Sequence, residues 1–305
     1  MRGKIIILVA MLVFLIYGSS IVYIQAQYPG YGVKYRPLIG GIQIEITKAE
    51  WYGPGASKGF CSLAFPVTFA ENNGQTGRLG FITAGHCIET ANGGDYVDQP
   101  TKGSWFWENY IGRGIRTSWP YGGGSSDLDA ALIRLENPGL HAFIFENGIY
   151  RQFDMPDRNN RVGITEYLTP SNLMVGTIVY KSGRTTGLTY GQIIDINGEW
   201  RPPNTNIVIK PVIIITRCPN GQCFYNDRPI SDRGDSGGVW YIRYPIYAYR
   251  FDPYRLEYGA KVIGIHNGGS NINAVASWAT KISEKWPDLY ISYVVCGSNR
   301  TSSCW

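Results

Sequence analysis

Short apolar runs alternate with clusters of Gly, Pro, Asn and Asp along most of the chain. Runs of this length, bounded by turn residues, favour β-strands over helices, and their close spacing favours a sandwich or barrel over βαβ units. The pattern therefore predicts an all-β fold. Strands are expected at 42–46, 62–67, 80–84, 130–135, 176–180, 191–196, 206–216, 238–242 and 261–266.

One helix is predicted, over 277–290 near the end of the chain. Trp278, Ile282 and Trp286 fall on one face there, Ser277 or Thr280 is available as the N-cap, and Pro287 would break or kink the helix. Elsewhere the pair Asn197-Gly198 predicts a tight hairpin turn, because both residues tolerate positive φ.

The composition agrees with this fold. Of 305 residues, 44% are apolar and 17% are charged, which is typical of a globular chain. The 38 Gly, 22 Tyr and 9 Trp fit a strand-rich protein with many turns. The net charge is +5, without a Lys/Arg cluster, so nucleic acid is not expected as a partner.

The amino terminus carries an export signal. Arg2 and Lys4 precede an apolar run at 5–17, followed by Gly-Ser-Ser, so we predict a signal peptide at 1–26 with cleavage after Ser20 or Ala26. The alternative is an uncleaved membrane anchor, because 5–24 is about as long as a bilayer-spanning helix. In either case the rest lies outside the cytoplasm, and we expect secretion. Residues 27–38 form an extended lead-in.

Six cysteines fit an exported chain, in which an even number suggests disulfides. Their connectivity stays open at this point, because six cysteines allow 15 pairings. A metal site is the alternative, but no C-x-x-C pair occurs and the only histidines are His86, His141 and His266. We expect neither a metal nor a cofactor.

Three segments carry residues for nucleophilic catalysis. Ser236 lies within Gly-Asp-Ser-Gly-Gly, His86 closes Thr-Ala-Gly-His-Cys, and Asp129 directly precedes an apolar run. A serine needs a base to take its proton, and a buried carboxylate fixes the tautomer of that base. We predict His86 as the base, Asp129 as its partner and Ser236 as the nucleophile, with the N–H groups of Gly234 and Ser236 binding the oxyanion. Asp127 competes with Asp129, but a solvated loop acid is the simpler interpretation of Asp127.

These motifs, in this order, resemble those of the chymotrypsin-like serine peptidases. The segment Lys-Ser-Gly-Arg-Thr-Thr-Gly at 181–187 is similar to that of the bacterial streptogrisin and α-lytic type, and the resemblance covers about 39–282. An α/β-hydrolase, which shares G-x-S-x-G, has the order Ser, acid, His instead. The resemblance implies two six-stranded antiparallel β-barrels with the active site in the cleft between them. Residues 39–150 would form the first barrel, and 151–305 the second with its C-terminal helix and tail.

The resemblance also implies contacts. Asp235 is expected to form a structural ion pair with Lys181, where the bacterial relatives carry an arginine; the alternative is a surface lysine of little consequence. Tyr180 and Tyr190 stand where relatives have a disulfide, so an aromatic contact is expected there. The disulfides that follow are Cys61–Cys87, Cys218–Cys223 and Cys296–Cys304.

For the substrate pocket, the resemblance gives a hypothesis of cleavage after Glu or Asp. Ile230 replaces the aspartate of trypsin-like pockets, and His266 stands where glutamate-specific relatives have a histidine. The alternative is that His266 is a buried strand residue. Asn267 departs from the usual serine, which puts the geometry there in question. The pocket would comprise Ile230, Ser231, Arg233, His266, Asn267, Gly268 and Gly269.

We therefore predict an exported, monomeric serine endopeptidase that acts on polypeptides through an acyl-enzyme. One alternative is a catalytically silent homologue that serves as a binding protein, since one fold hosts several uses. Such homologues commonly lose a triad residue, whereas this sequence has all three. An esterase would use the same groups on a different acyl substrate.

Overall fold

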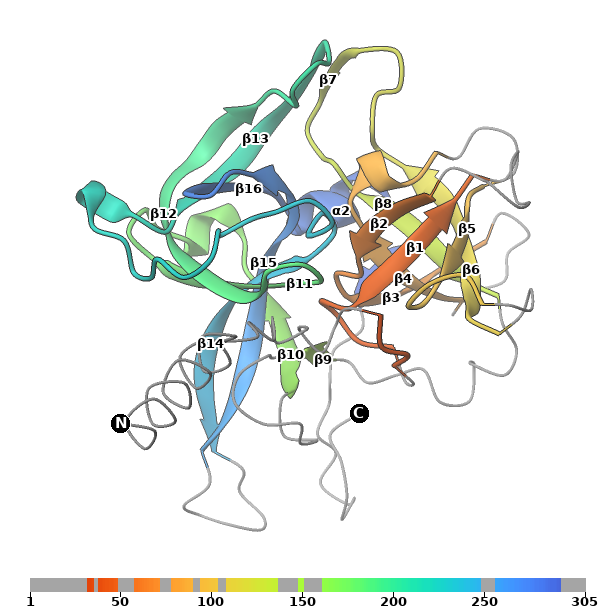
Figure 1. Ribbon diagram of the computed structural model, residues 1–305, viewed down its shortest axis with the longest axis horizontal. Coiled ribbons are helices and arrows are strands. Elements are labelled where there is room, and N and C mark those ends of the chain that lie inside the picture. The colour runs from red at the N-terminus through yellow and green to blue at the C-terminus, as the bar shows by residue number, and fades with distance from the viewer. Residues whose placement is uncertain are drawn as a thin grey trace, which may run out of the picture.

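The computed structural model describes residues 32–35, 38–48, 58–71, 78–89, 94–103, 108–136, 148–150, 161–247 and 256–291. The predicted signal, most of the lead-in and the Cys296–Cys304 pair lie outside these ranges. The described residues form two large sheets (Figure 1). None of the helices among them is long and apolar enough to span a bilayer.

The first sheet has the order β17-β3-β4-β8-β6-β5-β1-β2. Its β2 pairs with β1, while β3, four residues further on, pairs with β4. The bent segment 58–69 therefore closes a barrel of six antiparallel strands within the described ranges, and β17 extends it. The strands are β1 (Gln43–Thr47), β2 (Lys58–Ser62), β3 (Pro66–Phe69), β4 (Arg78–Thr83), β5 (Tyr96–Asp98), β6 (Tyr110–Thr117), β8 (Ala131–Leu135) and β17 (Leu289–Ile291).

The second sheet has the order β14-β11-β12-β13-β16-β15-β10-β9. An additional pairing of β14 with β15 closes its first six strands into a second antiparallel barrel, again counted over the described residues. The predicted all-β fold of two barrels is therefore confirmed. The strands are β9 (Gly148–Tyr150), β10 (Arg161–Tyr167), β11 (Ile178–Gly183), β12 (Gly187–Trp200), β13 (Ile207–Thr216), β14 (Val239–Tyr247), β15 (Leu256–Gly269) and β16 (Asn273–Trp278).

Strand alternation distributes apolar side chains between the barrel interiors and the layer between the barrels. Phe81 and Ile133 point into the first barrel, whereas their neighbours Ile82 and Leu132 pack in a cluster shared by both barrels. That shared cluster also contains Val239 of the second barrel. The two barrels therefore pack against each other through an apolar layer.

The barrels are also connected by backbone hydrogen bonds between two strands. The short strand β7 (Gly124–Ser126), from a loop of the first barrel, pairs in parallel with Ile207–Ile209 of β13. Figure 1 shows this contact where the long β12–β13 hairpin meets the β7 loop. We call β7 and the β12–β13 hairpin together the strap. Ile207, Ile209 and Val212 of the strap form an apolar cluster with Val275 of β16, and Trp119 and Trp200 pack against this cluster.

Two local predictions need correction. The helix α2 spans only Thr280–Lys285, because Ser277 and Trp278 belong to β16, and the chain after Pro287 returns to the first barrel as β17. Neither predicted cap is used: α2 begins after Ala279 without a side-chain cap. Asn197-Gly198 makes no hairpin turn. It lies inside β12, where the register shifts at Gly198, and β13 begins only at Ile207.

The remaining described elements are short 3-10 turns: η2 (Gly85–Cys87), η4 (Pro170–Asn172) and η5 (Pro219–Gly221). The chain crosses from the first sheet to the second between β8 and β9. The domain boundary at residue 150 stays a prediction.

Candidate active site

His86 lies in η2, directly after β4. Its backbone N–H donates to Oδ1 of Asp129 over 2.8 Å, and its Nδ1 lies 2.8 Å from Oδ2 of the same carboxylate. Gly85 is required before it, because a Cβ there would be 2.8 Å from that Oδ1. A carboxylate facing Nδ1 fixes the proton on that nitrogen and leaves Nε2 as the basic atom.

The carboxylate of Asp129 is fully buried and held by several donors. Besides His86, the Nδ2 of Asn267 donates to Oδ2 over 2.8 Å and to the Asp129 carbonyl oxygen over 3.0 Å. The Asp129 backbone N–H donates to Oγ of Ser277 over 3.0 Å. The competing acid, Asp127, is partly exposed and is not bonded to His86. Asp129 is thus the acid that the fold brings to the imidazole.

The pKa of His86 is raised from its ordinary value of 6.5. Burial by itself lowers it, but the negative charge of Asp129 and the hydrogen bond to that carboxylate outweigh the burial. An imidazole with a raised pKa is a stronger base for taking a hydroxyl proton.

Ser236 lies on the turn that leads into β14, next to the segments around His86 and Asp129. Its carbonyl oxygen accepts from the N–H of Ser62 over 2.7 Å. A Cβ on the adjacent Gly237 would be 2.2 Å from Oγ1 of Thr83 and 3.0 Å from the nitrogen of Ala84, just before the His86 turn. Gly237 also has a φ of +85°, so glycine is needed there on two counts.

The hydroxyl of Ser236 donates to the carbonyl oxygen of Asn267 over 3.3 Å. Among the hydrogen bonds of the described residues there is none between Ser236 and His86. The connection between the serine and the His86–Asp129 pair instead runs through Asn267, whose side chain binds the acid. Serine–base contacts are often long in a ligand-free site and shorten when substrate binds.

The predicted oxyanion groups lie on the same turn. Within the described part of the chain, the N–H groups of Gly234 and Ser236 form no hydrogen bond. Gly234 has a φ of +92°, and its carbonyl oxygen accepts from Oγ of Ser62 over 3.0 Å. The carbonyl oxygens of Gly234 and Ser236 are therefore bonded to Ser62, whereas the N–H groups of these two residues, on either side of Asp235, are left available to an anion.

Asp235 points away from the serine, into the second barrel. Nζ of Lys181 lies 2.6 Å from its Oδ2, and both side chains are fully buried. Thr186 donates to the carboxylate through its hydroxyl over 2.6 Å and its backbone N–H over 3.1 Å. Burial raises the pKa of Asp235, but the charge of Lys181 and the hydrogen bonds from Lys181 and Thr186, with the charge of His266, together outweigh this, and the pKa is lowered below 3.8. This Lys181–Asp235 ion pair is the one that the sequence predicted. It attaches the serine turn to β11 of the second barrel.

The predicted pocket residues occupy different environments. His266 is fully buried between Ser231 and Trp240, while Ile230 packs into the core of the second barrel. Arg233 is exposed. Asn267 is an extra residue in the pairing of β15 with β16, whose register shifts between His266 and Gly268. Such a bulge re-aims a side chain, and here the Asn267 amide points to Asp129.

Two tryptophans near His86 were not anticipated. The ring centroids of Trp119 and Trp200 lie 5.3 and 6.2 Å from that of His86. Trp200 also covers Gly268, where a Cβ would be 3.0 Å from the indole. No local motif marks these residues, because the strap that brings them together joins segments of both barrels.

Two disulfides occur among the described residues. Cys61–Cys87 ties β2 to the His86 turn, and Cys218–Cys223 closes a short loop. Tyr180 and Tyr190 are in contact, with ring centroids 5.8 Å apart, as expected where relatives have a disulfide.

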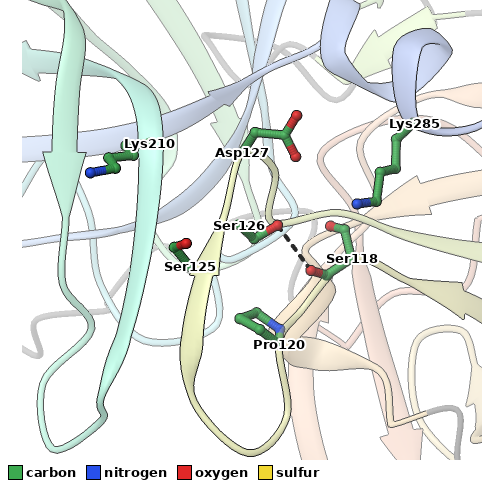
Figure 2. A pocket seen from close by; sticks show the side chains of 7 residues that line it. All are labelled: Ser118, Pro120, Ser125, Ser126, Asp127, Lys210 and Lys285. Atoms are coloured by element: carbon green, nitrogen blue, oxygen red, sulfur yellow. Dashed lines mark hydrogen bonds between the residues drawn. The ribbon is translucent and has the colours of Figure 1, made fainter.

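A pocket of about 400 Å³ is lined by residues of the strap, of the loop that carries β7 and of α2 (Figure 2). It contains none of the predicted catalytic residues. Within it Ser126 Oγ donates to the carbonyl of Ser118 over 3.1 Å. The described residues contain no group of three or more side chains suited to hold a metal ion. The pocket is lined by Ser118, Pro120, Ser125, Ser126, Asp127, Lys210 and Lys285.

Comparison with known proteins gives matches at the level of structure alone. No family model matches the sequence, and no curated protein matches it. A glutamic acid-specific serine protease, described as using a histidine triad in substrate binding, superposes with a TM-score of 0.51 and 22% identity, over 84% of this chain and 100% of its own. Protease A of Thermobifida fusca superposes with a TM-score of 0.53 and 19% identity, over 84% of this chain and 98% of its own. The Nocardiopsis protease superposes with a TM-score of 0.51 and 21% identity, over 83% of this chain and 97% of its own.

The chain therefore has the fold of the chymotrypsin-like serine proteases. An α-lytic protease homologue has the same fold, with a TM-score of 0.52 and 15% identity.

Proposed function

We propose that this protein is a serine endopeptidase that hydrolyses peptide bonds through Ser236, His86 and Asp129. The observation that carries the proposal is the bond between Nδ1 of His86 and the buried carboxylate of Asp129, next to the serine turn. His86 would take the proton of Ser236 as its oxygen attacks the peptide carbonyl, then deliver it to the leaving amine. In the second half of the reaction His86 would take a proton from water as the water oxygen attacks the acyl carbonyl, and would return that proton to the Ser236 oxygen as the acid product leaves.

The developing oxyanion would be bound by the N–H groups of Gly234 and Ser236, which form no hydrogen bond in the described part of the chain. The Lys181–Asp235 pair would hold that turn in place before substrate arrives. No cofactor takes part in this chemistry, and the substrates are polypeptides.

The experiment is labelling with a fluorophosphonate probe, followed by casein cleavage. Wild type should be labelled and should cleave casein, and Ser236→Ala should do neither. Ser171→Ala, which removes an exposed serine on η4, is the matched control and should behave as wild type. Wild type that is not labelled, or cleavage that survives Ser236→Ala, would remove the peptidase proposal and favour the silent binding protein.

We also propose that the enzyme prefers Glu or Asp on the acyl side of the cleaved bond. Support comes from His266 beside Ser231, and from the glutamic acid-specific protease among the structural neighbours. Peptides that differ only in the cleavage-site residue test this. Equal turnover of Glu and Leu peptides would contradict it.

The amino-terminal pattern and the two disulfides support action outside the cytoplasm as a secreted protein. We propose that it acts as a monomer. Amino-terminal sequencing of the exported protein should begin after Ser20 or Ala26, whereas an intact amino terminus in the membrane fraction would indicate the anchor. Size-exclusion chromatography should give the mass of one chain.

A further inference from the structure

The buried imidazole of His266 has a hydrogen bond at each ring nitrogen. Nε1 of Trp240, on β14, donates to Nδ1 of His266 over 3.1 Å. Oγ of Ser231 lies 2.8 Å from Nε2. An indole N–H is a donor only, so the nitrogen that faces it must be an unprotonated acceptor. The proton of the neutral ring is then on Nε2, and it is donated to Ser231.

Trp240 also makes the charged form of His266 costly. A proton on Nδ1 would face the indole N–H, with two donors opposed across 3.1 Å. The charged groups around the ring are Lys181 on β11, Asp235 on the serine turn and His86 on η2. Burial first, then the charge of Lys181, lower the pKa of His266 well below 6.5, against the opposing effect of Asp235.

Ser231 is the outer member of this chain of hydrogen bonds. It is 6% exposed, whereas His266 is fully buried. Since its oxygen accepts from His266, its own hydroxyl proton is directed elsewhere, and Ser231 lies against Gly269 of the predicted substrate strand. A substrate side chain in the pocket would therefore meet Ser231 before it met the imidazole.

We propose that Trp240 is a specificity-positioning residue: its indole N–H fixes His266 in the neutral tautomer with Nε2–H on Ser231, so that the pocket offers a substrate side chain the neutral hydroxyl donor of Ser231 instead of a cation. The inference rests on the proposed peptidase function and refines its preference. A carboxylate accepts stronger hydrogen bonds than an amide, but it finds no counter-charge from His266 here. We expect Glu to be favoured over Gln by about tenfold or less. That ratio should stay constant between about pH 5 and pH 8, where an ordinary histidine titrates.

The test compares wild type with Trp240→Phe, which removes the indole N–H and keeps an aromatic ring. For each, kcat/KM is measured on matched Glu and Gln peptides from about pH 5 to pH 8. In Trp240→Phe burial and Lys181 still disfavour the charged ring, but Nδ1 is free to carry the proton of the neutral ring. Ser231 can then donate to Nε2 instead of to the substrate, so the Glu/Gln ratio should fall toward one at every pH. Trp278→Phe is the matched control, because Trp278 is buried in the same cluster but donates to the Ile196 carbonyl. Its ratio should stay at the wild-type value.

Nitrogen NMR of the imidazoles gives a second readout that does not require turnover. In wild type and Trp278→Phe, His266 should stay the neutral Nε2–H form across this pH range, and in Trp240→Phe the Nδ1–H tautomer should appear. A wild-type His266 that titrates near 6.5, or a Trp240→Phe variant indistinguishable from wild type, would overturn the inference. Failure of the peptidase proposal looks different: wild type would not be labelled by the fluorophosphonate, while the NMR comparison would still decide the role of Trp240.

Discussion

The amide of Asn267 binds Asp129 twice, donating to its carboxylate over 2.8 Å and to its carbonyl oxygen over 3.0 Å. The backbone carbonyl oxygen of Asn267 in turn accepts a hydrogen bond from the hydroxyl of Ser236. One residue therefore connects the acid of the first barrel with the serine of the second. The serine that relatives carry at this position has a single hydroxyl, whereas the amide has two N–H donors.

Replacing this amide should reduce activity without unfolding the chain. A hydrogen bond to a charged group contributes about 1.5–3 kcal/mol, so Asn267→Ala should lower kcat/KM by roughly ten- to a hundredfold. Asn267→Asp should lower kcat/KM further, because ionising two adjacent carboxylates costs free energy. Steady-state kinetics measure this, with Asn271→Ala, an exposed loop position, as control. Full activity in Asn267→Asp would contradict the role.

As the pH is lowered, kcat/KM should begin to fall at a pH above the ordinary pKa of histidine. His86 acts as a base only when neutral, and its pKa is raised above 6.5 because the effect of Asp129 exceeds that of burial. As the pH falls through that raised value, His86 gains a proton and kcat/KM drops. A pH–rate profile measures the midpoint. Asp127→Asn should leave it unchanged, and a wild-type midpoint below 6.5 would be inconsistent with the pairing.

Loss of the buried cation should destabilise the second barrel and the serine turn. Lys181→Met leaves Asp235 buried without its counter-charge, which costs about 3–5 kcal/mol. Because burial then raises the pKa of Asp235, the variant should regain stability as the pH falls and the carboxyl is protonated, the opposite of wild type. Urea unfolding at several pH values measures both effects. The control is Lys210→Met, whose exposed side chain is 3.9 Å from Glu199 and should matter little.

The two disulfides should differ in their contribution. Cys61 and Cys87 are 26 residues apart, and Cys218 and Cys223 only 5. In the chain-entropy model the longer loop contributes about 3.5 kcal/mol and the shorter about 2 kcal/mol. Replacing both cysteines of a pair by serine and unfolding each variant in urea compares them. The Cys61/Cys87 variant should also lose activity, because Cys87 follows His86. Equal losses of stability in both pairs would contradict this model.

Much of the molecule could be predicted from local sequence. The strand runs between turn clusters are enough to give an all-β fold, because strand periodicity and turn chemistry are local properties. The motifs around His86, Asp129 and Ser236 identify candidate groups in a specific order. The ion pair of Lys181 and Asp235 could be inferred from motif positions in the same way.

The predictions that failed depended on competition between local and tertiary preferences. The helix expected at 277–290 shrinks to α2, because Ser277 and Trp278 gain more from pairing with β15 and β13 than from a helical turn. Asn197-Gly198 becomes part of β12, because the strap extends that hairpin beyond the turn signal.

The order of residues specifies which side chains are chemically able to act, whereas the folded arrangement specifies what surrounds each of them. Trp240 faces His266 only because β14 and β15 pair, and Trp119 and Trp200 reach His86 only because the strap joins the barrels. Hydrogen bonding, burial and the resulting pKa values depend on atoms that are distant in sequence, and no local pattern encodes such contacts. The sequence thus specifies where a histidine stands, but the folded environment decides whether that histidine is charged or neutral.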